Sequence, residues 1–254
     1  MSTVTRDGLT ARLFGVEFLD ELRAIVREPT SLLFSIVMPI GMFVLFVSLF
    51  GKGNSEFGGP VGTQMVATFG TFGVLAVALL NPGTSVAADR NRGWLRAKQV
   101  SGVPVGVTLA AKVASALPYA LGLLIAMTVA ARLTGALTAP PVKLLAIAGI
   151  LLLGALPFAL LGLAVGFVAS PNATAAVLNA VLLPSAVFSG LWMPLEIMPE
   201  FVRDLAPFLP TYHLARLAMT PLYGGEVFVH VLVLLGTTAV TATLAAVAYR
   251  RGKP

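Results

Sequence analysis

The spacing of charged residues is the feature of this 254-residue sequence that most constrains its fold. A membrane-spanning helix needs about 20 apolar residues to cross roughly 30 Å of hydrocarbon. Ser170-Pro171-Asn172 is typical of a turn and divides the longest uncharged stretch into two spans. The sequence therefore predicts six spans. The stretches without Asp, Glu, Lys or Arg are 29–51, 57–88, 113–131, 144–195 and 227–249.

The composition agrees with a membrane protein. Hydrophobic residues make up 57% of the sequence, charged residues 11%, and the mean hydropathy is +0.91. A soluble domain would carry about 25% charged residues. We therefore predict an all-α integral membrane protein, in which residues 1–29 precede a six-span domain at 30–254. The predicted spans cover approximately 31–50, 63–87, 106–131, 144–169, 173–194 and 228–249.

The basic residues are divided unequally between the two predicted sides of the membrane. Twelve Lys and Arg and six Asp and Glu lie before the first span, between the second and third, and after the sixth. The loops on the other side hold five basic and five acidic residues. Because basic loops stay in the cytoplasm, both termini are predicted to be cytoplasmic. The pI near 10.1 then reflects topology and anionic lipid headgroups rather than nucleic acid binding.

The N-terminal segment predicts an amphipathic helix in the membrane interface. Apolar residues recur at a spacing of three to four from Leu9 onward, charged residues lie between them, and Pro29 ends the pattern. One interpretation is a simple membrane anchor. The other is a docking platform for a cytoplasmic partner, which acids such as Glu17 and Glu21 favour because they gain nothing from anionic lipid.

The predicted cytoplasmic loop 89–104 is short, basic and partly helical in pattern. It could be a solvated loop that only sets topology. Trp94 argues against this, because a large aromatic residue among charges usually packs on a membrane or a partner. Trp94, Leu95 and Gln99 could together present a small face to a groove.

The same loop resembles the type-2 permeases of ATP-binding-cassette (ABC) exporters. The shared order is an acid, basic residues, Arg-Gly-x-Leu, and a Ser/Thr-Gly/Pro-x-Pro break before the next span. In that family the stretch is the coupling helix, which fits a cleft of the ATPase subunit. The family usually has Glu at the position of Asp89 and Thr at that of Trp94. The residues expected to couple to the ATPase are Asp89, Arg92, Gly93, Trp94, Leu95, Arg96 and Gln99, with Glu17 and Glu21 of the N-terminal helix.

A second segment, from Phe188 to Glu200, resembles the same family. A Ser/Gly-rich turn precedes a Pro-Leu-acid-x-x-Pro motif, and an amphipathic stretch follows. The prolines forbid one continuous helix, and the segment is too apolar for an ordinary water-exposed loop. Short re-entrant helices over 195–222 are therefore expected, although a lid without substrate contact is an alternative. The motif residues are Gly190, Pro194, Glu196 and Pro199.

The substrate route is expected to be apolar with a few polar points, because no Asp, Glu, Lys or Arg is expected deep in a span. The resemblance implies that spans two and five line it. Each polar residue could instead be satisfied within the bundle. Uncharged spans rich in Met and Phe favour amphipathic drugs, antibiotics or lipids as substrates. The candidates for substrate contact are Gln64, Thr68, Asn81, Asn179, Ser185 and Ser189.

Two further patterns concern packing within the spans. The stretch Gly162-Leu163-Ala164-Val165-Gly166 predicts close helix packing in span four. A proline occurs once in each of the first five spans, which predicts kinks. These prolines stand at positions 39, 82, 118, 157 and 184.

The sequence lacks the Gly-x-x-x-x-Gly-Lys-[Ser/Thr] phosphate loop. ATP and Mg are therefore expected on a separate ATPase subunit, with no catalytic, cofactor or metal site in this chain. His213 is expected to be a local hydrogen-bonding residue and His230 to be interfacial. We expect a permease subunit of a bacterial inner-membrane exporter, with two permeases, identical or paralogous, and two ATPases. The alternatives are an ion-coupled secondary transporter, which commonly carries charges within spans, and a membrane-embedded lipid or cell-wall enzyme, which needs clustered acids or histidines.

Overall fold

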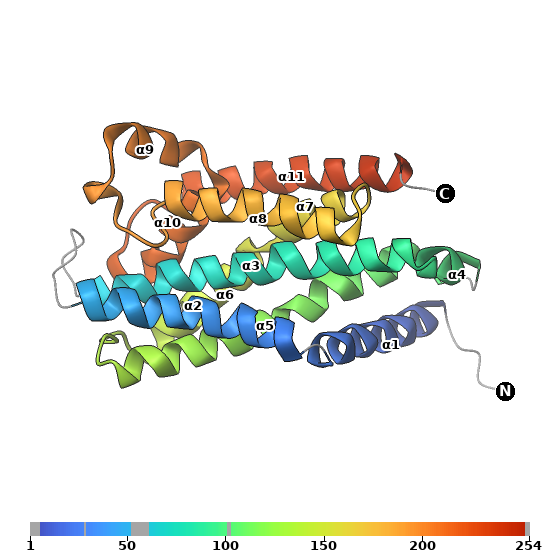
Figure 1. The fold of residues 1–254 in the computed structure, drawn as a ribbon, viewed down its shortest axis with the longest axis horizontal. Coiled ribbons are helices and arrows are strands. Elements are labelled where there is room, and N and C mark those ends of the chain that lie inside the picture. The colour runs from blue at the N-terminus through green and yellow to red at the C-terminus, as the bar shows by residue number, and fades with distance from the viewer. Residues whose placement is uncertain (1–5, 28, 52–60, 101–102, 252–254) are drawn as a thin grey trace.

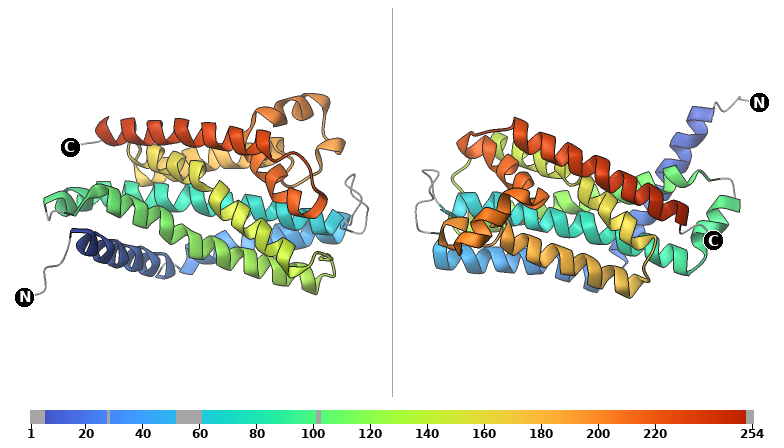
Figure 2. Two further views of the ribbon diagram at one scale, coloured as in Figure 1. Left: turned by 180° about the vertical axis from the view of Figure 1, so that it is seen from behind. Right: turned by 90° about the horizontal axis from the view of Figure 1, so that it is seen from above.

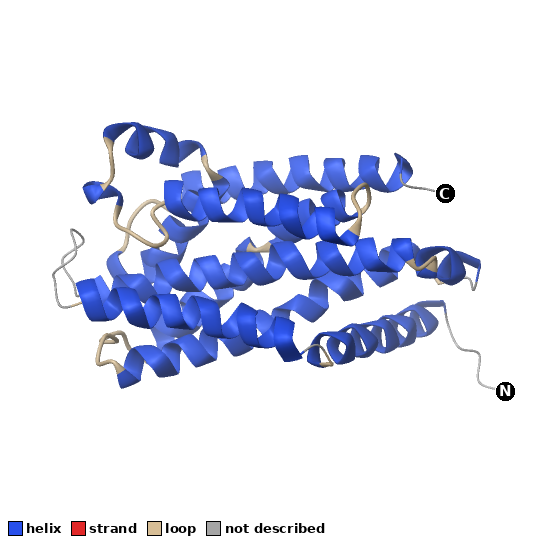
Figure 3. Cartoon of the chain, in the orientation of Figure 1, coloured by secondary structure: helices blue, strands red, loops and turns tan. Residues whose placement is uncertain are grey.

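The computed structural model describes residues 6–27, 29–51, 61–100 and 103–251, and every regular element among them is a helix (Figure 3). The all-α prediction is confirmed for this part of the chain. The long helices run along the long axis of the molecule, and both termini lie at one end (Figure 1). We call this the proximal end and the opposite end the distal end.

The elements follow one another in a simple order. The helices are α1 (Arg6–Val26), α2 (Pro29–Phe50), α3 (Val61–Asn91), α4 (Trp94–Val100), α5 (Val105–Leu133), α6 (Pro141–Gly154), α7 (Leu156–Gly166), α8 (Pro171–Phe188), η1 (Leu195–Ile197), α9 (Glu200–Leu205), η2 (Ala206–Phe208), α10 (Pro210–Tyr223) and α11 (Phe228–Arg251).

Five membrane spans can be assigned among the described residues by length and apolar composition. They are α3, α5, the α6–α7 pair, α8 and α11. In α2, the first predicted span, the described apolar stretch is Ile36–Phe50, which is shorter than these five spans. The described chain is therefore multi-spanning, and most predicted boundaries lie within a few residues of the helix ends.

The predicted end of span five, at residue 194, is wrong. Helix α8 ends at Phe188, and Gly190 follows with a φ of 69°. This left-handed conformation is typical of a residue just after a helix and suits glycine, which has no Cβ. Ser189 therefore lies beyond the helix rather than on a helical face with Ser185.

Of the five prolines expected to kink spans, Pro157 alone coincides with a break between helices. Helix α6 ends at Gly154, and Pro157 lies in the first turn of α7. Proline is tolerated there because its missing N–H would have no partner within the helix. The other four prolines lie inside α2, α3, α5 and α8, which continue through them.

Helix α3 is the centre of the bundle. It packs against α2, α5, α7, α8 and α10 (Figures 1 and 2). Within its most apolar 18-residue stretch 83% of residues are buried, compared with 17% in α11. Both are apolar enough to span a membrane, so burial rather than hydropathy distinguishes the central helix from a peripheral one.

The glycines of α7 bring it into close contact with α3, which confirms the predicted packing. A Cβ at Gly162 would overlap the backbone oxygen of Leu79, and a Cβ at Gly166 would overlap that of Gly83. Gly83 in turn faces the backbone of Gly162. Small residues allow membrane helices to approach at backbone distance and gain van der Waals contact.

Helix α1 lies outside this central group and packs mainly against α5 (Figure 2). It covers Arg6–Val26, which includes most of the segment 9–28 that was expected to be helical. The helix carries both exposed apolar residues and covered acidic residues. Val16 and Leu19 are about half exposed, while Glu17 and Glu21 are largely covered.

Candidate functional site

The predicted coupling loop contains a short helix set off by one glycine. Gly93 has a φ of 75°, and it separates the end of α3 from α4 at the proximal end (Figure 1). Its N–H donates to the backbone oxygen of Arg90 at 3.1 Å, which closes the turn. A residue with a Cβ would be strained in this conformation. Residues 101–102 of the loop lie outside the described part.

Trp94 and Leu95 point in different directions, although the sequence placed them on one partner-facing surface. Trp94 is 55% exposed, whereas Leu95 is 9% exposed and belongs to a buried apolar cluster that includes Leu163 and Phe167. Neighbouring residues on a helix with 3.6 residues per turn lie about 100° apart, so one side chain can anchor α4 while the next faces outward. Leu95 is therefore an anchor. The expected roles of Arg96 and Gln99 concern side chains outside the described part.

An ion pair joins α4 to α1. Lys98 Nζ lies 2.6 Å from Glu17 Oε2, and both side chains are mostly buried. The two residues are 81 positions apart in the sequence. The coupling helix and the N-terminal helix are therefore directly connected.

A second set of polar contacts lies beneath α1, and we call its members Glu21, Ser85, Asp89 and Lys112 the Lys112 cluster. Lys112 Nζ lies 2.5 Å from Glu21 Oε1 and 2.7 Å from Asp89 Oδ2. It also donates to Ser85 Oγ at 2.7 Å, while Ser85 donates to Glu21 Oε2 at 2.9 Å. One ammonium group thus connects α1, α3 and α5.

Burial explains why this lysine has so many partners. Its side chain is fully buried, and an unpaired charge in such a position is strongly unfavourable. Lys112 was counted with the basic residues of the cytoplasmic loop, but it lies inside α5 and its side chain is buried. Thr108, Lys112, Ser115 and Tyr119 recur at intervals of three and four on the buried face of α5. This polar stripe is the signal that could have identified the residue.

These contacts also change the interpretation of three residues expected to face the ATPase. Glu17, Glu21 and Asp89 each form an ion pair with a lysine of the same chain. The acids of α1 are therefore explained by intramolecular pairing. These three residues connect helices of the chain, and their predicted contact with the ATPase stays a prediction.

Arg90 extends this connection to the turn between α7 and α8. Its Nη2 donates to the backbone oxygen of Ala169 at 2.8 Å, and its Nη1 donates to that of Phe167. Carbonyls at a helix C-terminus lack partners within the helix and favour a cation. The neighbouring Arg92 is exposed at the end of α3.

At the distal end, part of the predicted pathway meets the second family motif. A cavity of about 20 Å³ lies between α3 and the segment that follows α8. This volume suits about one water molecule. The sequence-predicted residues that line it are Gln64, Thr68, Ser189, Gly190, Pro194 and Glu196, and Tyr212 and Arg216 of α10 complete the wall.

The distal segment is built from short helices, as expected. Ser189 hydrogen-bonds to Thr211 at the start of α10, and the ring of Trp192 meets that of Phe72 edge to face at 5.1 Å. Pro199 immediately precedes α9. Helix α10 packs against α3, α6 and α11, so the motif is held on the bundle.

Comparison with known proteins places these two sites in one family. The family model described as ABC-2 type transporter matches residues 12–223. The chain belongs to the ABC-2 type transporter family. The match extends from α1 to the end of α10, and therefore includes both the proximal and the distal site.

A similar curated protein is the putative transport permease YvfS of Bacillus subtilis (strain 168). It is 23% identical over 208 residues, which cover 81% of this chain and 84% of the relative. Membership of the ABC-2 family identifies the chain as the membrane permease of an ABC transporter and implies association with an ATP-binding-cassette ATPase. It also suggests a transport subunit without an ATP site of its own.

The remaining pathway candidates of this ABC-2 permease lie apart from the distal cavity. Asn179 Nδ2 donates to the Ala175 oxygen at 2.9 Å, and Ser185 Oγ donates to the Val181 oxygen at 2.5 Å, so both bond within α8. Asn81 differs: its buried Nδ2 has no hydrogen-bond partner among the described residues. A buried amide without a partner is uncommon and costs free energy.

The two histidines of the permease meet at the distal end, a pairing that the sequence did not predict. Their Nδ1 atoms lie 2.8 Å apart, and His213 Nε2 lies 2.8 Å from the backbone oxygen of Pro207. Since a carbonyl only accepts, His213 Nε2 carries a proton, and in the neutral pair His230 Nδ1 donates to His213 Nδ1. His213 is thus a local hydrogen-bonding residue, as expected. Among the described residues no group of three or more His, Asp or Glu could hold a metal ion.

Proposed function

We propose that this ABC-2 permease is the six-span membrane subunit of an exporter. Two permease chains, identical or paralogous, would combine with two ATPase subunits that bind ATP and Mg. The observation that carries the proposal is the construction of α4. Trp94 faces outward, Leu95 anchors the helix in the bundle, and Lys98 connects it to α1. A helix of this kind could be displaced by the ATPase and transmit that displacement to α1 and the bundle.

The proposed route of coupling follows the proximal contacts. Closure of the ATPases would move α4 through Trp94, and the Lys98–Glu17 pair would carry the motion to α1. The Lys112 cluster would then carry it to α3 and α5, because one buried ammonium is bonded to groups on both neighbouring helices. The proximal ends of these helices would thus move together rather than one by one.

We expect Trp94→Asp to abolish stimulation of the partner ATPase while the permease still folds and inserts. Trp94 is more than half exposed, so its loss costs little packing, whereas a carboxylate in an apolar cleft of the ATPase would be unfavourable. The measurement is co-purification of the ATPase and its rate of ATP hydrolysis. Inverted vesicles containing the complex should lose ATP-dependent transport.

Two variants serve as controls for this experiment. Trp94→Phe should retain coupling because it preserves an aromatic contact. Leu95→Asp should instead lower thermal stability, since it places a charge in the buried apolar cluster to which Leu95 belongs. Full ATPase association and transport in Trp94→Asp would exclude this helix as the docking element. Transport in these vesicles driven by an ion gradient without ATP would favour a secondary transporter.

The proposed topology has α2 as the first span and places both termini in the cytoplasm of the bacterial cell, with α1 in the membrane interface. Its support is the excess of basic residues in the proximal segments. The chain has no cysteine, so single cysteines can test the orientation. Glu200→Cys at the distal end should react with an impermeant thiol reagent added to intact cells, and Val100→Cys should not. The opposite labelling would invert the topology.

The proposed substrates are amphipathic molecules such as drugs, antibiotics or lipids. The polar side chains of α3 before Asp89 and those of α8 are uncharged, and the buried Asn81 amide has an unused donor in the described structure. Ser185 lies one turn along α8 from Val181, which is 42% exposed, so this side is available to a second permease chain. The re-entrant segment and the cavity of about 20 Å³ beneath it would close the distal end of the route.

A further inference from the structure

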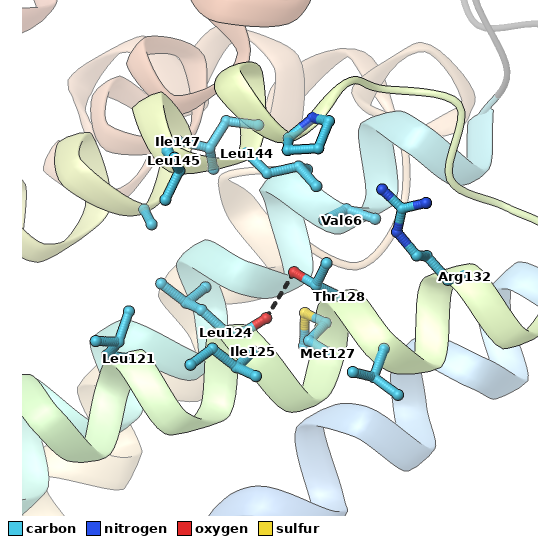
Figure 4. A pocket seen from close by; sticks show the side chains of 13 residues that line it. Val66, Leu121, Leu124, Ile125, Met127, Thr128, Arg132, Leu144, Leu145 and Ile147 are labelled. Carbon is cyan, nitrogen blue, oxygen red and sulfur yellow. Dashed lines mark hydrogen bonds between the residues drawn. The ribbon is translucent and has the colours of Figure 1, made fainter.

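We infer that the permease binds an anionic phospholipid in a groove between α5 and α6. The groove is a cavity of about 370 Å³ at the distal end of these helices, separate from the cavity described above. Figure 4 shows side chains of α5, among them Leu124 and Ile125, facing Leu144 and Leu145 of α6. Its volume falls within the ~300–1,000 Å³ typical of ligand sites.

The wall of the groove is apolar in its chemistry. Thr128 is the one hydroxyl residue that lines it, and its Oγ1 already donates to the Leu124 oxygen at 2.7 Å. Ile125 is 57% exposed and Leu145 is 72% exposed, so the groove opens to the surroundings of the bundle. Since α5 and the α6–α7 pair are candidate spans, those surroundings are hydrocarbon. The acyl chain of a lipid is therefore a suitable occupant of the groove.

The length of the groove fits one leaflet. The lining residues of α5 extend from Leu121 to Arg132, which corresponds to about 16 Å along a helix. Half of the hydrocarbon core is about 15 Å thick. Because Arg132 lies at the distal end of α5, the groove runs from near the middle of the bilayer to its distal surface. An acyl chain lying along it would place its headgroup beside Arg132.

Charge at this end selects an anionic headgroup. Arg132 is exposed, is the one charged residue lining the groove, and has no ion pair or side-chain hydrogen bond among the described residues (Figure 4). Residues 133–142 contain no acid. A phosphate beside the Arg132 guanidinium would be favourably placed.

The test measures lipid binding to the purified full-length chain, so it does not depend on the ATPase or on transport. Phosphatidylglycerol and phosphatidylcholine with identical chains are added to delipidated protein, and bound lipid is counted by native mass spectrometry. Wild type should bind phosphatidylglycerol about fivefold more tightly, since a cation near the surface contributes about 1 kcal/mol to the attraction of an anionic lipid. Arg132→Gln should remove this preference.

Filling the groove should affect both lipids. Leu145→Trp and Ile125→Trp, on facing helices, should each reduce binding of both lipids at least tenfold while leaving the melting temperature within a few degrees. The matched controls are Arg203→Gln on α9 and Leu235→Trp on α11, which should behave as wild type. Unchanged lipid binding in Leu145→Trp and Ile125→Trp, or equal affinity of wild type for both lipids, would overturn the inference. Conversion of a dimer to a monomer by Leu145→Trp would assign the groove to a second permease chain instead.

The leaflet assignment rests on the proposed topology, but the binding does not. With both termini cytoplasmic, the lipid would come from the outer leaflet. If cysteine labelling inverts the chain, the same preference for phosphatidylglycerol should persist with the lipid in the cytoplasmic leaflet. Failure of the lipid experiment and failure of the proposed function are therefore separate results.

Discussion

Replacing Lys112 with methionine should lower the stability of the permease by about 3–5 kcal/mol, the usual cost of removing one partner from a buried ion pair. Methionine has a similar length but no charge, so Glu21 and Asp89 would face each other without a cation. Helix α1 would lose its ion pair with α5. Thermal unfolding of the purified protein, followed by helical circular dichroism, should show a clearly lower melting temperature.

Two comparisons separate the charge effect from a loss of packing. Lys98→Met removes a pair whose side chains retain 22% and 13% exposure, so its melting temperature should fall less. Adding Glu21→Gln and Asp89→Asn to Lys112→Met removes the unpaired carboxylates and should recover part of the loss. A Lys112→Met protein that melts like wild type would show that the cluster contributes nothing to stability.

Gly162→Ala should destabilise the bundle by about 3 kcal/mol, at the upper end of the usual cost of overpacking. The added Cβ would meet the backbone oxygen of Leu79, which cannot move without shifting α3. Gly149→Ala is the matched control, because it lies in the other half of the same span with no atom near its added Cβ. That control should be neutral or stabilising, since alanine is the better helix former. Equal melting temperatures for the two variants would contradict the close contact between α3 and α7.

The secondary structure could be predicted from sequence because its determinants are local. Uncharged stretches gave the helices, Pro29 and Pro171 stand where helices begin, and the glycine spacing of α7 indicated its close contact. The end of α8 was misplaced because residues 189–194 are apolar enough to continue a span. The conformation of Gly190 ends the helix there, and hydropathy does not encode it.

The sequence singled out Glu21 and Asp89 but not the lysine that pairs with both. Glu21 and Lys112 are 91 positions apart, and no local pattern states that one should neutralise the other. The same holds for the His213–His230 contact across two helices. Trp94 and Leu95 were predicted to face the same partner. Successive residues of a helix point about 100° apart, so the two side chains face different sides. Side-chain direction depends on the rotation of α4 about its axis, which is set by its packing on α3 and α5.

The break at Ala155 gives the two halves of the fourth span different main neighbours. Helix α6 packs mainly on α10, while α7 packs on α3 and α11. Proteins open in cooperative units that follow such packing, and the least stable units open first. The distal half of this span therefore belongs to the same unit as α10, and the proximal half to the unit of α3. The two halves of this span would then open independently. Amide hydrogens of α6 could exchange with solvent while those of α7 stay protected.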